Sequence, residues 1–255
     1  MNNVKIGAIL FLLFLGTADV FAGPNDVEAE YRNTLRLLDR RIADILHNLS
    51  SASIPGHKQR FHEEPSFPDL NGEGEPDLIR IDMQPGTIKK TGRPLDLAIE
   101  GNGFFSFTDG KTGEIVYTRS GSLETTPGGN LCLVSGNSVR LLDPQICLRE
   151  ETVSVFVNES GQVQVSLEDN GKKQIVGTIQ LATFVSPTRL KVLDERYFFE
   201  TEFSGPPTLR SAGFDGAGVI KSGCLEDSNV DVENALRELK RLLSVRKTLK
   251  EFFLD

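Results

Sequence analysis

Residues 94–107 read Pro-Leu-Asp-Leu-Ala-Ile-Glu-Gly-Asn-Gly-Phe-Phe-Ser-Phe, two short apolar runs on either side of a Gly-Asn-Gly turn. Short alternating runs bounded by turn residues are typical of β-strands. Gly101-Asn102-Gly103 also resembles the start of a dinucleotide-binding loop, but the third glycine is missing and Phe104-Phe105 continues into a strand. The stretch therefore predicts two strands of a β body and no cofactor site.

The same pattern continues toward the C-terminus. Further short apolar runs are Ile115–Thr118, Asn130–Val134, Thr152–Val157, Gln162–Leu167 and Gly177–Val185. The turn signals between runs are Asp109-Gly110, Pro127-Gly128-Gly129, Ser160-Gly161 and Asn170-Gly171, where glycine supplies the positive φ that tight hairpins require. We therefore expect an all-β body over residues 82–215, preceded by a polar linker over residues 63–81 that contains several proline, glycine and acidic residues.

Both ends of the chain outside this body read as helices. Over Val27–Leu49 apolar residues recur at spacings of 3 and 4, which is a heptad seam. A second helix is expected over Val230–Phe253, and its apolar stripe slips in phase near Leu242 and Leu243. Each stripe is narrower than that of a helix packed on a domain core, so each seam requires another helix.

The seam residues form a candidate assembly interface. They are Tyr31, Leu35, Leu38, Ile42, Ile45, Leu49, Val232, Leu236, Leu239, Leu243 and Leu249. Burying the N-terminal set represents on the order of 10 to 18 kcal/mol gross, an upper bound that is too large to leave in water. Two arrangements satisfy the seams: a helical hairpin within one chain, or pairing within the chain combined with packing on neighbouring subunits. The expected fold class is mainly β with terminal α-helices that pair as a coiled coil, in arms over residues 23–62 and 216–255.

The first 22 residues have the pattern of a secretory signal peptide. Lys5 precedes the apolar run Ile6–Leu15, and small residues lead up to Ala22. The run is shorter than the roughly 20 apolar residues that span a bilayer, and an uncleaved membrane anchor is the alternative. Export would place three cysteines, Cys132, Cys147 and Cys224, in an oxidising compartment. A Cys132–Cys147 disulfide and three buried thiols are both open alternatives.

Composition and motifs argue against several classes of function. The 255 residues include 28 Lys and Arg against 36 Asp and Glu, a formal charge of −8, so the basic footprint of a nucleic-acid-binding protein is missing. The spacing of His47, His57 and His62 fits no metal-ligand scheme, and no Gly-x-Ser-x-Gly motif is present. We therefore expect no catalytic, cofactor or metal site, and an enzyme is the least favoured class.

A family resemblance runs from Met83 onward. Gln84–Phe105, Tyr117–Leu123, Gly129–Leu131, Leu181–Pro187 and Gly218–Val232 resemble, in order, the bacterial flagellar basal-body rod and hook protein family, and the last two segments resemble its distal rod branch more than the hook. The residues that carry the resemblance are Pro94, Leu95, Asp96, Ala98, Ile99, Gly101, Gly103, Phe104, Phe105, Tyr117, Thr118, Arg119, Gly121, Gly223, Leu225, Glu226, Ser228, Asn229 and Val230. Ile45–Lys58 is a weaker echo, with His57 where the family has an aromatic residue.

The resemblance implies a structural subunit of the flagellar basal-body rod. Its terminal helices would pair as a coiled coil in a tube wall, its β body would pack outward, and heterologous stacking would build a helical shaft that transmits torque for motility. The implied partners are further copies of the chain and other rod and hook proteins, without nucleic acid, cofactor or, after signal cleavage, membrane. The implied location is the periplasmic part of the basal body.

Two features depart from the family. Its rod proteins leave through the flagellum's own export channel without a cleaved leader, and the linker here is short and acidic for a distal rod protein. The alternative is a periplasmic binding module that keeps the β body and docks on another envelope or flagellar protein through its terminal helices.

Overall fold

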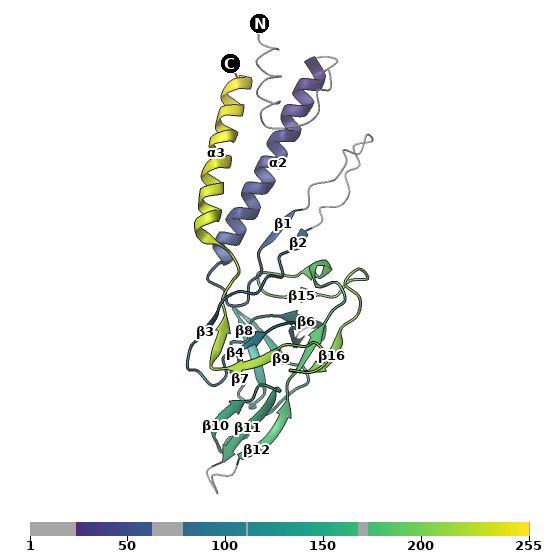
Figure 1. Cartoon of the computed structure of the whole chain (residues 1–255), viewed down its shortest axis with the longest axis vertical. Helices are drawn as coiled ribbons and strands as arrows, with labels where there is room; N and C mark the ends of the chain where they lie inside the picture. The colour runs from purple at the N-terminus through teal and green to yellow at the C-terminus, as the bar shows by residue number, and fades with distance from the viewer. Residues whose placement is uncertain (1–23, 63–78, 111, 168–172, 255) are drawn as a thin grey trace.

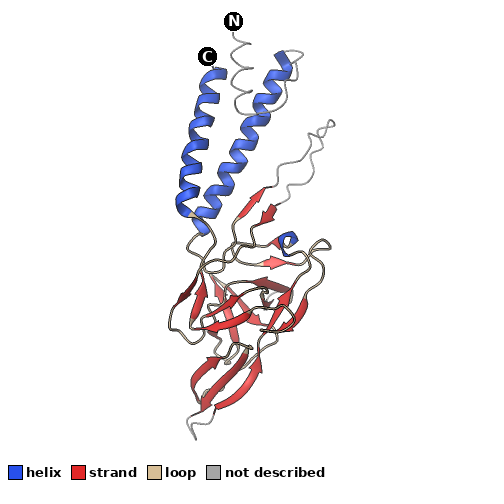
Figure 2. Cartoon of the chain, in the orientation of Figure 1, coloured by secondary structure: helices blue, strands red, loops and turns tan. Residues whose placement is uncertain are grey.

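The structure is a computed structural model that describes residues 24–62, 79–110, 112–167 and 173–254. Figure 1 shows an elongated molecule in which two helices lie side by side and project from one end of a β body. Figure 2 shows that strands make up the body and that the arm is helical. The predicted leader (residues 1–22) and most of the predicted linker (residues 63–78) lie outside the described residues.

The arm consists of α2 (Pro24–Ser51) and α3 (Val232–Leu254). The two helices predicted from the sequence are therefore confirmed, with ends that differ by one to three residues from those expected. Neither described helix is both long and apolar enough to cross a membrane.

The largest sheet of the body has seven strands in the order β14-β15-β6-β5-β9-β8-β7, all paired antiparallel. Its strands are β5 (Phe105–Asp109), β6 (Ile115–Thr118), β7 (Glu124–Thr125), β8 (Leu131–Ser135), β9 (Ser138–Leu142), β14 (Lys191–Val192) and β15 (Phe198–Phe199). A three-stranded antiparallel sheet at the end far from the arm contains β10 (Thr152–Val157), β11 (Gln162–Leu167) and β12 (Lys173–Thr178).

Four two-stranded ladders complete the described sheets. They pair β1 (Arg60–His62) with β2 (Ile79–Ile81), β3 (Ile88–Lys90) with β18 (Cys224–Glu226), β4 (Leu97–Glu100) with β17 (Val219–Ser222), and β13 (Gln180–Thr183) with β16 (Thr208–Ser211). A 3₁₀ turn, η1 (Pro187–Arg189), follows β13. The β3–β18 and β4–β17 ladders bring the C-terminal part of the body back to its N-terminal part, so both helices leave the body at the same end.

Two apolar clusters form the core of the body. Because side chains alternate along a strand, Phe105 and Phe107 enter the main cluster while Phe104 enters a second cluster with Tyr117 and Phe198. Among the described residues, neither cluster includes a side chain of α2 or α3. The arm therefore does not share the core of the body.

The predicted strands are largely confirmed, and β6, β10 and β11 have the expected bounds. Three details differ from the expectations. The run Gly177–Val185 is divided, because β12 ends at Thr178 and β13 begins at Gln180 in another sheet. The turn after β5 has its positive φ at Gly113, not at Gly110, because the chain makes a longer turn there. All three thiols are free, with Cys132 and Cys224 buried and Cys147 exposed, so neither the disulfide nor three buried thiols is found.

Candidate assembly interface

The two helices of the arm run antiparallel, because α2 ends and α3 begins at the body. At the end far from the body, the Tyr31 ring stacks on Phe253 with centroids 3.8 Å apart. Further along, Arg246 Nε donates to Asp39 Oδ1 at 2.5 Å across the pair. An exposed ion pair contributes about 0–1 kcal/mol, so apolar contact must supply most of the stability between the helices.

The predicted seam of α2 is mostly withdrawn from solvent. Ile42 is buried, and Tyr31, Leu35, Leu38, Ile45 and Leu49 are half-buried. In α3, Leu249 is buried and Leu239 is half-buried. Leu242, which the sequence analysis left out of the interface, is also buried, at 4% exposure. The slip in phase near Leu242 and Leu243 was the signal that pointed to it.

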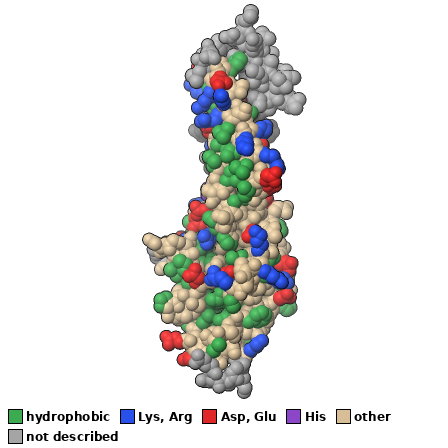
Figure 3. All heavy atoms as spheres, turned by 90° about the vertical axis from the view of Figure 1, so that its left-hand side faces the viewer, with side chains coloured by type: hydrophobic (Ala, Val, Ile, Leu, Met, Phe, Trp, Pro, Cys, Tyr) green, Lys and Arg blue, Asp and Glu red, His purple; other side chains and the backbone are tan. Residues whose placement is uncertain are grey.

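The remaining seam residues of α3 face outward. Val232, Leu236 and Leu243 expose 45%, 44% and 46% of their surface, and their spacing places them along one face of the helix. Figure 3, which shows the side of the molecule on which α3 lies, has hydrophobic side chains gathered along the arm. We name Val232, Leu236 and Leu243 the outer stripe. Single exposed leucines are ordinary, but an apolar row along a helix favours a partner.

Three charged side chains, which we name the charge cluster, meet beneath the arm. Glu226, at the end of β18, has a side chain that is 0% exposed. Its Oε1 accepts hydrogen bonds from Lys58 Nζ at 2.6 Å and from the Gly86 N–H at 3.0 Å, and its Oε2 accepts one from Arg119 Nε at 2.8 Å. Lys58 follows α2 and Arg119 follows β6, so one carboxylate links the root of the arm to the body.

Arg119 uses every donor of its guanidinium. Nη1 donates to the carbonyls of Gly101 at 2.9 Å and Gly103 at 2.6 Å, and Nη2 donates to Ile99 O at 2.7 Å and reaches Glu226 Oε2 at 2.8 Å. The carbonyls belong to the segment from Ile99, in β4, to Gly103, before β5, and this segment contains the Gly-Asn-Gly turn. That segment therefore serves as a cradle for an arginine side chain, and a lysine lacks the planar fork needed to fill it.

Asn229 braces the start of α3. Its Oδ1 accepts a hydrogen bond from the Gln59 N–H at 2.7 Å, and its Nδ2 donates to the carbonyls of Asp82 at 2.9 Å and Gln84 at 3.1 Å. One amide side chain thus joins the segment after α2, the segment before α3 and the segment between β2 and β3.

The turn after α2 lies directly on the end of β6. Gly56 has a φ of +73°, and a Cβ there would lie 2.4 Å from Ser120 N, closer than side-chain atoms come to backbone. The Gly56 N–H also donates to Glu226 O at 2.7 Å. Glycine is therefore required for Lys58 to reach the charge cluster.

Burial also perturbs two histidines at the root. His57 is 1% exposed, and its Nδ1 lies 2.5 Å from Glu195 O, so this nitrogen carries the proton. The rings of His47 and His57 are 5.9 Å apart. Desolvation lowers the pKa of both imidazoles, and the nearby positive charge of Arg60 lowers it further. Both rings therefore favour the neutral form.

The β1–β2 ribbon is tied to α2 by two side chains. Asn48 Nδ2 donates to Arg60 O at 2.7 Å, and Asn48 Oδ1 accepts from the Arg60 N–H at 3.1 Å, as a neighbouring strand would. Asp44 Oδ2 accepts from the His62 N–H at 2.9 Å, and Asp44 Oδ1 lies 2.6 Å from His62 Nδ1. α2 is thus held on its flank as well as at its end.

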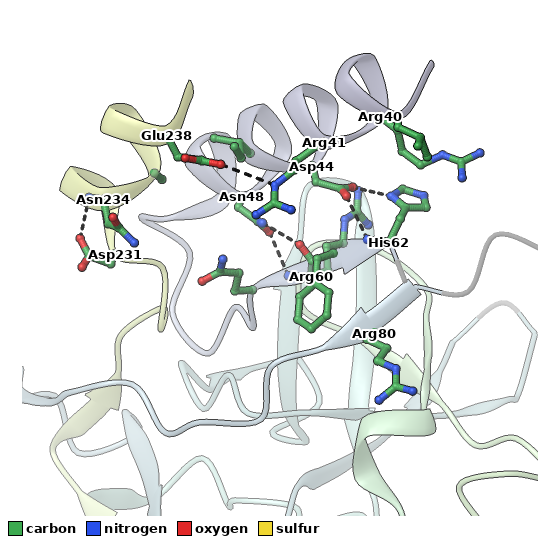
Figure 4. A pocket seen from close by; sticks show the side chains of 15 residues that line it. Arg40, Arg41, Asp44, Asn48, Arg60, His62, Arg80, Asp231, Asn234 and Glu238 are labelled. Atoms are coloured by element: carbon green, nitrogen blue, oxygen red, sulfur yellow. Dashed lines mark hydrogen bonds and ion pairs between the residues drawn. The ribbon is translucent and has the colours of Figure 1, made fainter. Parts of the chain in front are cut away.

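A cleft of about 810 Å³ opens between this ribbon and the roots of the two helices (Figure 4). Its lining includes Arg40, Arg41, Arg60 and Arg80 together with Asp44, Asp231 and Glu238. Both signs of charge therefore line its walls. In the part of the chain that the structure describes, no three His, Cys, Asp or Glu side chains are grouped to hold a metal.

The structure gathers part of the family motif around the charge cluster. Ile99, Gly101, Gly103, Arg119, Glu226 and Asn229 converge there. Of the others, Asp96, Ala98, Phe104, Phe105, Tyr117, Thr118 and Gly121 are buried elsewhere in the body, Leu95, Gly223, Leu225, Ser228 and Val230 are half-buried, and Pro94 is exposed. Sequence reasoning assigned no role to Asp44, Asn48 or Lys58. Lys58 had one weak signal, since it ends the echo at Ile45–Lys58.

A helix pair with an apolar outer stripe thus projects from a β body, and buried charges join the two parts. Residues 98–165 match the family described as "Flagellar hook protein FlgE/F/G D1 domain". Over these residues the chain is similar to the flagellar rod and hook protein family, as the sequence resemblance indicated.

Among individual proteins, the sequence is similar to flagellar basal-body rod proteins. It is 35% identical to the flagellar basal-body rod protein FlgG of Caulobacter vibrioides over 170 residues, which are 67% of this chain and 62% of that protein. It is 32% identical to FlgG of Bacillus subtilis over 59% of this chain and 57% of that protein. It is 27% identical to the rod protein FlgF of Escherichia coli over 75% of this chain and 78% of that protein. The matches thus span about 60% of the length of these FlgG relatives.

Proposed function

We propose that this protein is a structural subunit of the flagellar basal-body rod, and that it polymerises into the axial shaft that transmits torque for motility. The observation that carries this proposal is the outer stripe, because it leaves an apolar row exposed on a helix that has already paired with α2. The similarity to FlgG and FlgF proteins, whose names describe them as basal-body rod proteins, supports it.

In this proposal α2 and α3 pair as a coiled coil within each subunit, and the outer stripe packs on the next copy. The same helix pair thus satisfies the intramolecular seam and the contact between subunits. A half-exposed leucine gains about 1 kcal/mol when it is fully buried, so the stripe contributes about 3 kcal/mol to each contact. On the partner copy, Leu46 of α2 is 51% exposed, so we propose that it belongs to the surface that receives the stripe. Such a contact joins two different patches, and it builds a filament when the rotation does not close a ring.

The proposed location is the periplasmic part of the basal body, with further copies and other rod and hook proteins as partners. The leader pattern over residues 1–22 supports export by the general secretory route. Mass spectrometry of the protein from isolated basal bodies tests this route: a chain that begins near Gly23 supports it, and an intact Met1 contradicts it.

Sedimentation velocity of the purified chain over a range of concentrations tests assembly. The wild-type chain is expected to form large species as its concentration rises. The double variant Leu236→Ser, Leu243→Ser is expected to associate roughly 30-fold more weakly, because about 2 kcal/mol is lost at each contact. A control is Val153→Ser, Phe156→Ser, which removes two apolar side chains that are 65% and 50% exposed from β10 of the body. Equal weakening by both double variants would contradict a role for the outer stripe.

The second candidate is a periplasmic binding module that docks on another envelope or flagellar protein through its helices. The leader pattern favours it, since the rod proteins that the chain resembles carry no cleaved leader. A chain that stays monomeric at high concentration, with both helices formed by circular dichroism, would support this module over the rod subunit.

A further inference from the structure

The contact between arm and body is unusual in its chemistry. Neither apolar cluster of the described residues reaches into α2 or α3, so no shared core fixes the angle between the two parts. Parts of a chain without a large apolar interface are expected to move relative to one another. On apolar packing alone, the root of the arm would be a hinge.

Buried polar contacts occupy this hinge position. Lys58 Nζ, on the arm side, bonds both Glu226 Oε1 and Gln84 O at 2.6 Å. Its side chain is 2% exposed, that of Glu226 is 0% exposed and that of Arg119 is 6% exposed. On the α3 side, the amide of Asn229 holds three backbone groups from two other segments. Each of these contacts joins segments more than 100 positions apart in the chain or crosses from arm to body.

We propose that the charge cluster and Asn229 are a lock that holds the helical arm at one angle to the β body, with Lys58 as the positioning residue. Polar groups in a low-dielectric interior tolerate few arrangements, because any displacement leaves a charge or a donor unpaired. An apolar contact in the same place would slide at little cost. A buried ionic cluster therefore restricts this junction to one geometry, whereas leucines in the same place would hold the two parts together without fixing their angle.

The balance of charges in the cluster also favours rigidity. Two cations surround one carboxylate, so Glu226 cannot leave without exposing Lys58 and Arg119 to each other. Burial lowers the pKa of Lys58, and the charge of Glu226 and its hydrogen bond to Lys58 oppose that shift. Load applied to the β body would thus reach both helices through fixed contacts. This inference concerns the isolated subunit and is independent of whether copies assemble.

The angle of the arm is measured by electron-spin distance measurements on dilute full-length chain. One label is attached to the native exposed Cys147 in the body, and the other to a cysteine introduced by Arg36→Cys on α2. Arg36 lies about 22 Å along the helix from Ser51, so a swing of the arm changes the distance between the labels measurably. The wild-type background is expected to give one narrow distance distribution.

Lys58→Met and Glu226→Gln are expected to broaden that distribution roughly twofold while the helical content is unchanged. Either change removes the Lys58–Glu226 ion pair and loosens the root of the arm, while Asn229 and the contacts of Asn48 and Asp44 with β1 still tether it. Lys58→Met is the safer variant, since it leaves Glu226 paired with Arg119 and buries no lone charge. Lys221→Met is the matched control, because Lys221 pairs with Glu159 at 2.7 Å on the surface of the body. A distribution as narrow as wild type in folded Lys58→Met would overturn the proposal whatever the fate of Glu226→Gln.

Discussion

At the scale of single residues, Arg119 is the side chain on which most contacts depend. Arg119→Met would leave Glu226 paired with Lys58, but it would strip the carbonyls of Ile99, Gly101 and Gly103 of their donor. We expect the free energy of unfolding to fall by about 3–5 kcal/mol, as for other buried pairs that lose one partner. Urea unfolding measures it. Arg210→Met, which removes a partly exposed pair with Asp215, is the control and should cost under about 1 kcal/mol.

The histidines at the root predict a pH dependence. Because the folded pKa of His57 lies below the ordinary 6.5, the unfolded chain binds its proton first as the pH falls. Above about pH 6.5 the residue is neutral in both states and has no effect, and below it the stability declines until the folded pKa is reached. Lys58 and Arg60 add to the repulsion, and the charge of Glu195 opposes it.

His57→Gln is the test of this linkage, since the amide N–H can still donate toward Glu195 O. The urea midpoint of the wild type is expected to fall between about pH 7 and about pH 5.5 more steeply than that of the variant. Identical slopes for the two chains would show that His57 does not titrate with folding.

Sequence reasoning reached some of these residues but none of their roles. Arg119, Gly101, Gly103, Glu226 and Asn229 were singled out through family resemblance. Nothing in the spacing showed that they meet, because Lys58 and Glu226 are 168 positions apart and buried charges carry no periodic pattern.

At the scale of elements, two neighbouring leucines of α3 have different roles: one packs within the helix pair, and the other belongs to the outer stripe proposed for assembly. Leu242 is 4% exposed and Leu243 is 46% exposed. Leu242→Ala is expected to destabilise the helix pair by about 2–4 kcal/mol through a cavity, whereas Leu243→Ala should cost under about 1 kcal/mol in the isolated chain. Thermal unfolding followed by circular dichroism gives both values. If Leu243→Ala lowered the free energy of unfolding more than Leu242→Ala, the face of α3 that packs on α2 would differ from the one described.

The helices and the longer strands could be predicted because their signals are local. Heptad spacing gave α2 and α3, and alternating β-branched runs gave β10 and β11. The strands β3, β14, β15 and β18 have only two or three residues each. They form because distant segments pair with them, so a short stretch of sequence does not predict them.

At the scale of the whole molecule, the order of a β body between two helical ends follows from composition and periodicity. The angle of the arm and the identity of the solvent-exposed face of α3 do not follow from composition or periodicity. Both depend on contacts between segments that are remote in the sequence. The description of the molecule is therefore a β body with an arm that is internally paired, locked at its root and left apolar along its outer stripe.

Recovery of the protein in isolated basal bodies tests the central claim, that the outer stripe builds this chain into the flagellar rod. Basal bodies are purified from cells that express either the wild-type chain or the variant Leu236→Ser, Leu243→Ser, and the protein in them is quantified by mass spectrometry. We expect the wild-type chain to be present and the variant to be strongly depleted at equal cellular abundance. Absence of the wild-type chain, or equal incorporation of the variant, would contradict the account.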